Sequence, residues 1–266
     1  MKTVSEPIAI VGLALRLPGA DTLQDLWPIL ADGRSMITEL PQERRAAGFP
    51  KDKKFWGGFV DGADGFEPAF FGISPREAQT MDPQQRFVLE LAWNAMEDAG
   101  YTPDTLAGAR TGVFMGSCHW DYLEMMARSD APADPYKPTG IATSILSNRV
   151  SYQFDFSGPS VTNDTACSSA LVAVYQAVQA LRDDSCDVAL AGAANLIWSP
   201  DHFLTFERNG MLSKTGKSRA FDSRADGYVR GEGAVVVLLK KLSRAKADGD
   251  PVHAVLRGIG INHGGR

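Results

Sequence analysis

The feature that most constrains the fold is a series of short apolar runs, most of them bounded by glycine, that alternate with helical patterns. The runs cover residues 8–12, 112–116, 188–192 and 234–239, with a last candidate at 253–261. Strands that are apolar on both faces belong to sheets that helices cover on both sides. The alternation therefore predicts an α/β fold with some parallel strand pairing.

Three helical patterns are readable between these runs. Asp82 before Pro83 predicts a helix start, with Gln85 as its capping-box partner, and Gly100 predicts the helix end. A second pattern covers about 139–152. A third runs from about 165 to 181 and carries no charge after its start, which predicts a helix buried nearly all round.

The segment at about 33–80 differs from the rest of the chain. It is rich in glycine, proline and charged residues, and it also carries six aromatic residues, at positions 55, 56, 59, 66, 70 and 71. Such a long connection is uncommon unless it is structured, so we expect an excursion whose aromatic side chains pack on the core.

Composition excludes several classes of protein. The formal net charge of −5, spread along 266 residues, does not favour a nucleic acid or an anionic membrane as partner. Three cysteines do not suggest a disulfide framework, and four histidines show no metal-ligand spacing, so we expect no metal. The apolar run near the start follows Glu6 and Pro7 and is interrupted by Arg16, unlike a signal peptide. We expect a cytoplasmic protein.

Cys167 is the strongest candidate for chemistry. Residues 160–162 read as a short strand, and Cys167 then falls at the start of the third helical pattern. The positive end of a helix dipole and its free N–H groups favour a thiolate and can hold an oxyanion. The alternative is a buried, inert cysteine beside small residues, and placement alone leaves both readings open.

Other candidates are weaker. Cys118, His119 and Asp121 offer a thiol, a base and an acid, but triads are normally assembled from distant segments, so we interpret them as an incidental loop. Cys186 is expected to be structural. The segment at 210–218 has five residues between its glycines where a phosphate-binding loop needs four, so we reject that reading.

The remaining charged candidates are interpreted as structural. Arg230 and Glu232 lie in a glycine-rich turn that leads into the strand at 234–239. The acidic pairs at 61 and 64 and at 183 and 184 fit solvated turns. Lysines at 240, 241 and 246 predict a solvated helix face.

Several motifs, in order along the chain, resemble the β-ketoacyl synthase (ketosynthase) domain of modular type I polyketide synthases. The matching segments are 6–12, 16–19, 70–78, 81–86, 164–169 (Asp-Thr-Ala-Cys-Ser-Ser), 210–213, 221–222, 226–228 and 230–233. The closing segment, 262–266, is similar to ketosynthases that free-standing acyltransferases serve.

The resemblance implies a thiolase-like fold, layered α-β-α-β-α, built from two duplicated halves and usually found as a homodimer. It implies that Cys167 is the nucleophile, with its backbone N–H in the oxyanion hole, and that it accepts an acyl chain from the phosphopantetheine of an acyl carrier protein. A malonyl-derived carbanion then extends the chain by a decarboxylative Claisen condensation. No bound cofactor is implied.

The match also implies what lies beyond this chain. In the family, two histidines of the second half assist condensation, and none of the histidines here lies in a matching motif. We therefore expect residues 1–266 to be the amino-terminal portion of a ketosynthase domain, with the carboxy-terminal half absent and needed as a partner. One alternative is a condensation-incompetent half that acts as acyl anchor, gatekeeper or scaffold. Another is a different thiolase-fold acyltransferase.

Overall fold

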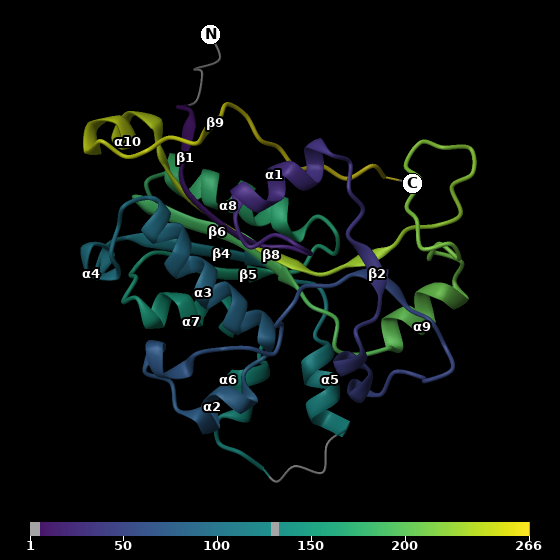
Figure 1. The fold of residues 1–266 in the computed structure, drawn as a ribbon. Coiled ribbons are helices and arrows are strands. Elements are labelled where there is room, and N and C mark those ends of the chain that lie inside the picture. Colours follow the sequence, from purple (N-terminus) through teal and green to yellow (C-terminus); the bar gives the residue numbers. More distant parts are fainter. Residues whose placement is uncertain (1–5, 129–132, 266) are drawn as a thin grey trace.

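The computed structural model describes residues 6–128 and 133–265, and its core is a six-stranded mixed sheet (Figure 1). The strand order is β5-β4-β6-β8-β1-β9. These strands are β1 (Ile8–Arg16), β4 (Thr111–Gly116), β5 (Ser160–Asn163), β6 (Val188–Asn195), β8 (Gly233–Lys241) and β9 (Ala254–Leu256). β4 pairs in parallel with β5 and β6, and the other pairings are antiparallel. The predicted α/β class and partial parallel pairing are confirmed.

Helices cover both faces of this sheet. On one face α3 (Pro83–Asp98) and α7 (Ile145–Gln153) lie against the strands, and on the other lies α8 (Ser169–Arg182). The strand residues alternate between the two layers: Val113 and Met115 belong to the core under α3, and Phe114 to the core under α8. Successive side chains of a strand point to opposite faces, so an all-apolar run is what a doubly covered strand needs.

The remaining elements surround this layered core. The helices are α1 (Leu23–Ala31), α2 (Pro75–Thr80), α4 (Pro103–Leu106), α5 (Asp121–Arg128), α6 (Lys137–Ile141), α9 (Asp201–Arg208) and α10 (Leu242–Asp248), with two short 3-10 turns, Gln42–Ala47 and Pro68–Phe71. A small second sheet has the order β2-β3-β7, from Ile37–Glu39, Trp56–Gly58 and Arg230–Gly231. Among the described helices, none has the length and apolar character needed to cross a bilayer.

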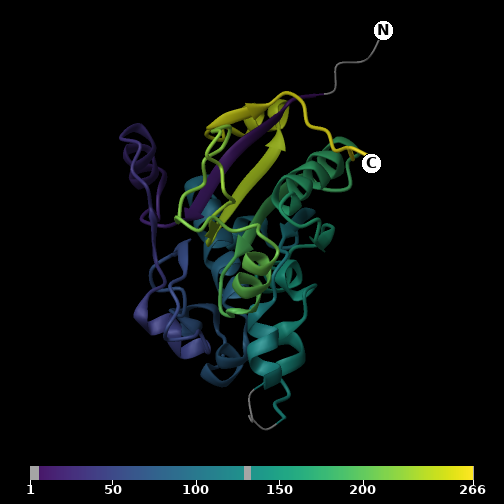
Figure 2. The ribbon, with the colours of Figure 1, turned by 90° about the vertical axis from the view of Figure 1, so that its right-hand side faces the viewer.

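The excursion at about 33–80 packs as the sequence predicts. Phe49 and Phe55 meet Phe203 of α9 edge to face, with ring centroids 6.3 and 5.3 Å from that of Phe203, and they contact each other at 5.2 Å. Phe66 and Phe71 join the core under α3. Trp56 and Phe70 are the exceptions, since both keep a large exposed area. Figure 2 shows the purple-to-blue excursion and α8 on opposite sides of the sheet.

The helix at 83–98 begins at Asp82, whose Oδ1 accepts from the Gln84 N–H at 2.8 Å. The capping-box expectation for Gln85 is wrong. Its amide instead donates to the carbonyls of Thr139 and Gly140. The predicted end is confirmed, because Gly100 takes a left-handed φ of +79° just after the helix.

The pattern at 139–152 forms two helices, α6 and α7, so the prediction of one continuous helix is wrong. The Gly140 carbonyl accepts hydrogen bonds from the Asp82 N–H and the Gln85 side chain of α3. A Cβ at Gly140 would lie 2.1 Å from the Thr80 carbonyl oxygen, so the two segments touch through their backbones. These contacts hold the end of α6 in place and turn the chain before α7.

Three further expectations are corrected. The candidate strand at 253–261 is ordered as a strand only over β9. Lys240 is not on a solvated helix face: it lies near the end of β8, is 2% exposed, and bonds to Tyr101, Asp248 and Asp250. Finally, α8 is not buried all round, because it lies on the sheet by one face and exposes Leu171 by 70%.

Candidate functional site

Cys167 lies in a tight turn between β5 and α8. It precedes the helix by two residues, and its side chain is exposed. The expected strand–turn–cysteine–helix order is confirmed, although the helix starts at Ser169 and not near Thr165. This places the thiol at the amino end of a helix of 14 residues, where the dipole favours negative charge.

The turn is held by side chains on both sides of Cys167. Asp164 accepts from the Ala166 N–H at 2.9 Å, and Ser169 Oγ accepts from the Thr165 N–H at 2.9 Å. Ser169 Oγ also donates to the Ala166 carbonyl at 2.7 Å. Ala166 has a φ of +56°, a left-handed conformation that costs a residue with a Cβ of order 1 kcal/mol. These bonds keep the strained turn in one shape and fix the direction of the thiol.

Gly116, at the end of β4, brings a second strand against this turn. A Cβ at Gly116 would lie 2.6 Å from the Ser169 carbonyl carbon. No side chain fits there, so the amino end of α8 rests directly on the end of β4. Asn163 adds a hydrogen bond from its side-chain amide to the Ser169 carbonyl.

A cavity of about 560 Å³ opens beside the thiol. Its walls come from the ends of β4, β6 and β8, from the first turns of α8 and from the loop after β4. The lining residues include Cys167, Ser117, Cys118, His119, Val174, Ala193, Tyr228, Arg230 and Val237. Small and aliphatic side chains dominate this lining, with a few polar groups among them. Such a lining suits a ligand that is mainly apolar.

The interpretation of Cys118 and His119 as an incidental loop needs correction. Both residues line the Cys167 cavity. Sequence could not show this, since Cys118 and Cys167 are far apart in the chain. Burial raises the pKa of the Cys118 thiol, which keeps it protonated, and burial and Arg230 lower the pKa of His119.

Asp121 does not join them, so the three neighbours form no triad, as expected. Its carboxylate instead accepts from the backbone N–H groups of Trp198 and Ser199, each at 3.0 Å. Cys186 is 1% exposed, and burial raises its pKa to about 11, so its structural role is confirmed.

Glu232 links the cavity wall to the excursion at about 33–80 through hydrogen bonds. Its carboxylate accepts from the N–H groups of Ile197 and Val60 at 2.8 and 2.9 Å, and from Arg44 at 3.2 Å. Arg44 also donates to the Ile197 carbonyl and stacks on Trp198. Burial raises the pKa of Glu232, and Arg44 opposes that rise. All of these contacts are structural, as the sequence predicts.

Arg230 is the cavity residue that sequence reasoning undervalued. It is 4% exposed, stacks over Phe203 and Phe206, and lines the cavity near Cys167. Its glycine-rich surroundings predicted only a turn, and nothing in the pattern placed that turn beside the cysteine. The segment at 210–218 is a loop that follows α9.

Comparison with known proteins gives one consistent result. The profile described as "Beta-ketoacyl synthase, N-terminal domain" matches residues 5–245. Polyketide synthase ThaG of Burkholderia thailandensis is 48% identical over 270 residues, which cover 98% of this chain and 5% of ThaG. Polyketide synthase PksN of Bacillus subtilis is 43% identical over 270 residues, covering 98% of this chain and 5% of PksN. This chain therefore spans only a small part of the length of these relatives.

Solved structures agree with the sequence matches. The oxazolomycin ketosynthase domain OzmH KS7 of Streptomyces albus JA3453 superposes with a TM-score of 0.88 at 40% identity, over 98% of this chain and 46% of that one. The ketosynthase from module 6 of the bacillaene synthase of Bacillus subtilis 168 gives 0.82 at 35% identity, over 94% and 42%. This chain thus has the architecture of the amino-terminal half of a thiolase-like fold.

Proposed function

Because this chain belongs to the β-ketoacyl synthase family, as the N-terminal domain of a modular type I polyketide synthase ketosynthase, we propose that Cys167 is its acyl-accepting nucleophile. The observation that carries the proposal is the position of the thiol. It is exposed, held by a strained turn, placed at the amino end of α8, and open to a largely apolar cavity. A buried inert cysteine would be neither exposed nor open to a cavity.

The proposed reaction begins with thioester exchange. The Cys167 thiolate attacks the carbonyl carbon of an acyl chain carried on the phosphopantetheine of an acyl carrier protein. The carbonyl oxygen becomes an oxyanion, which the backbone N–H of Cys167 stabilises. When the tetrahedral intermediate collapses, the phosphopantetheine thiol leaves and the acyl chain remains on the Cys167 sulfur.

Condensation then extends the chain. Loss of carbon dioxide from a malonyl unit on a second carrier protein leaves a carbanion, which attacks the Cys167 thioester. The product is a β-ketoacyl chain longer by two carbons, and Cys167 is released as the thiolate. The chain brings no cofactor of its own to these steps, since the phosphopantetheine belongs to the carrier protein.

The decarboxylation and attack need groups that we assign to a complementary carboxy-terminal half. The solved ketosynthase chains are about twice as long as this one, which supports reading residues 1–266 as the amino-terminal portion. The side of α8 that faces away from the sheet exposes Leu171 near the amino end of the helix, and it is the surface that we expect this half to cover.

Strand β5 supports the expected homodimer. It lies at the edge of the large sheet, pairs with β4 on one side, and exposes Val161. An unpaired strand edge invites pairing with a second chain. We therefore propose that two copies meet through β5.

An acylation assay tests the nucleophile. The chain is incubated with an acyl carrier protein that bears an acyl-phosphopantetheine, and its intact mass is followed. We expect one acyl group per chain, complete loss of labelling in Cys167→Ala, and normal labelling in Cys118→Ala, a matched control in the same cavity. Loading that survives Cys167→Ala would overturn the assignment.

The same assay separates condensation from acyl anchoring. Malonyl carrier protein is added to the loaded chain, with and without a complementary carboxy-terminal half. An elongated product with both halves supports the ketosynthase reaction. Loading without elongation under both conditions supports the anchor or gatekeeper alternative. Transfer of the unextended acyl group to another thiol supports the third candidate, a different thiolase-fold acyltransferase.

A further inference from the structure

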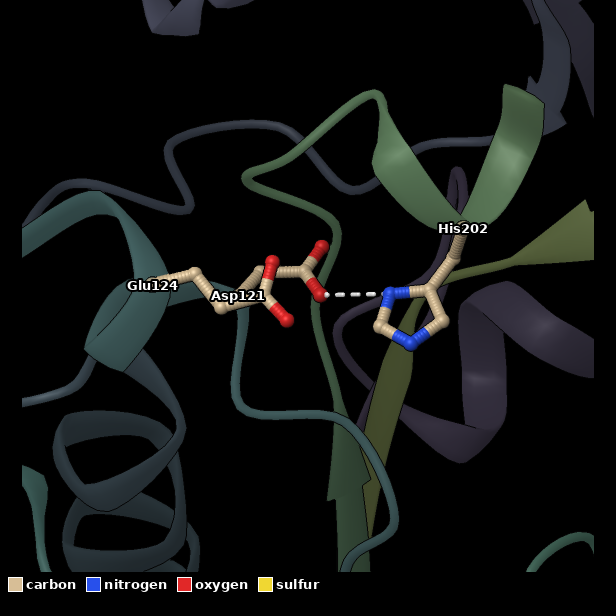
Figure 3. Close-up of side chains that lie close together, drawn as sticks. All are labelled: Asp121, Glu124 and His202. Carbon is tan, nitrogen blue, oxygen red and sulfur yellow. Dashed lines mark ion pairs between the residues drawn. The ribbon is translucent and has the colours of Figure 1, made fainter. Parts of the chain in front are cut away.

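Outside the Cys167 cavity, three side chains that can bind metals meet between two helices (Figure 3). Asp121 and Glu124 are three residues apart on α5, so they project from the same side of that helix. His202 comes from α9, which approaches from a distant part of the sequence. One ligand atom from each lies within 4.8 Å of the other two.

These three atoms make no hydrogen bond within the described structure, although two of them form an ion pair, Asp121 Oδ1 with His202 Nδ1 at 3.3 Å. Asp121 Oδ1, Glu124 Oε2 and His202 Nδ1 are all buried, and none of them takes part in a hydrogen bond. Buried polar atoms are nearly always satisfied. The ion pair leaves the Glu124 oxygen without a partner, so three such atoms that converge on one point require an explanation. Asp121 is itself 1% exposed and directs its free oxygen toward His202.

We propose that Asp121, Glu124 and His202 form a binding site for a divalent first-row transition metal, for which Zn²⁺ is the probe. One imidazole nitrogen and two carboxylate oxygens are a donor set that suits zinc. Water completes the coordination. The metal joins α5 to α9 and carries a structural role, since none of its ligands lines the Cys167 cavity.

The geometry is close to what a metal needs. Ligand distances of about 2.1 Å in a tetrahedral site put ligand atoms about 3.4 Å from one another. Asp121 Oδ1 and His202 Nδ1 are already 3.3 Å apart. Glu124 has the further distance to move, and its half-exposed, flexible side chain can rotate to reach the metal.

Neighbouring contacts fix two of the ligands. The second oxygen of Asp121 is held by the backbone N–H groups of Trp198 and Ser199. The His202 ring packs at a tilt against the rings of His119 and Phe206, with ring centroids 4.4 and 5.6 Å away. Hydrogen bonds to a carboxylate ligand orient it for a metal, and the ring contacts restrict how far the His202 imidazole can turn.

An ordinary ion pair explains only part of this cluster. Asp121 facing a protonated His202 would account for two of the three atoms, and Asp121 raises the pKa of His202. It leaves the buried Glu124 oxygen beside another carboxylate with no donor. The Nη groups of Arg230, a buried guanidinium nearby, make no hydrogen bond to either carboxylate. A divalent cation satisfies all three atoms.

Metal binding is tested on the full chain with Zn²⁺ by calorimetry and with Co²⁺ by visible absorption. We expect one ion per chain and a Co²⁺ spectrum without a thiolate charge-transfer band, because no cysteine is a ligand. Glu124→Gln and His202→Gln should each weaken binding by roughly tenfold or more. His253→Gln is the matched control, since His253 also pairs with an aspartate, Asp98, but has no third ligand among the described residues.

Three results would overturn the proposal. The first is no binding at a metal concentration of about 100 µM, which is far above the dissociation constant expected of a built site. The second is binding that Glu124→Gln and His202→Gln leave unchanged. The third is a thiolate band, which would place the ion on the cysteines. Glu124→Gln changes a half-exposed side chain by one atom, so it should fold and remain informative even if His202→Gln does not.

Discussion

Replacing Glu232 with alanine should destabilise the chain more than any change on its surface. The side chain has no exposed area, and its carboxylate serves two backbone N–H groups and one arginine. Alanine leaves both N–H groups buried without an acceptor, at about 1–3 kcal/mol each. It also leaves Arg44, itself 4% exposed, without its anion, a loss of about 3–5 kcal/mol for a buried pair.

These losses are not additive, because a local rearrangement that solvates one of the three groups also solvates its neighbours. We therefore expect a total loss of about 5 kcal/mol in the free energy of unfolding. A typical domain has about 5–15 kcal/mol of stability, so Glu232→Ala should be close to unfolded. Glu232→Gln keeps one acceptor oxygen and should lose about half as much. Urea unfolding followed by circular dichroism measures both differences.

A double-mutant cycle isolates the ion pair. Glu232→Gln combined with Arg44→Met removes both charges, so the double variant should be more stable than the sum of the single losses by about 2 kcal/mol. The reasoning is refuted if Glu232→Ala costs less than about 1 kcal/mol, or if the cycle shows no coupling. If Glu232→Ala does not fold, Glu232→Gln and the double variant can still be measured and still test the reasoning.

Three further predictions rest on other buried groups. Burial raises the pKa of Asp82 to about 6, so the folded chain holds the Asp82 proton more tightly than the unfolded chain does. The resulting contribution to the free energy of unfolding is about 3 kcal/mol; it is fully present below about pH 4 and is lost as the pH rises through about 6. Asp82→Asn keeps the helix cap and should flatten that pH profile in urea unfolding between pH 4 and 7, and an unchanged profile would contradict the burial argument. Gly116→Ala forces a methyl group onto the backbone of Ser169, so it should lower the stability by about 1–3 kcal/mol and slow the acylation of Cys167. Gly258→Ala is the control, because a Cβ there meets nothing. Equal acylation rates in the two variants would contradict the close packing of Gly116 on Ser169. Lys240→Met leaves the nearly buried Asp250 without its cation and should lower stability by about 3–5 kcal/mol. Lys246 is exposed, so Lys246→Met should change the melting temperature little. Similar effects of the two substitutions would support the interpretation of Lys240 as a solvated residue.

Much of the fold follows from local patterns. The apolar runs identify β1, β4, β6 and β8, because a strand between two helical layers must be apolar on both faces. Asp82 and Pro83 mark the start of α3, since capping depends on residues only two or three positions apart. The turn at Cys167 is equally local, as its hydrogen bonds join residues 164–169.

Long-range contacts decide what these patterns leave open. The uncharged stretch of α8 reads as a fully buried helix, yet one face is exposed, because burial depends on what packs against the helix. Lys240 looks solvated until β8 carries it beside Tyr101, more than a hundred positions away in the chain. Cys118 and His119 reach the cavity only because β4 ends beside the turn before α8.

The sequence by itself determined the α/β class, the likeness to a ketosynthase and the candidate nucleophile, since each rests on neighbouring residues or ordered motifs. Only the tertiary structure decided which groups share a site. Asp121 and His202 are 81 positions apart, and their 3.3 Å contact exists because the fold brings the first turns of α5 and α9 side by side. No spacing rule predicts such a contact, because folding, and not the order of residues, brings the two helices together.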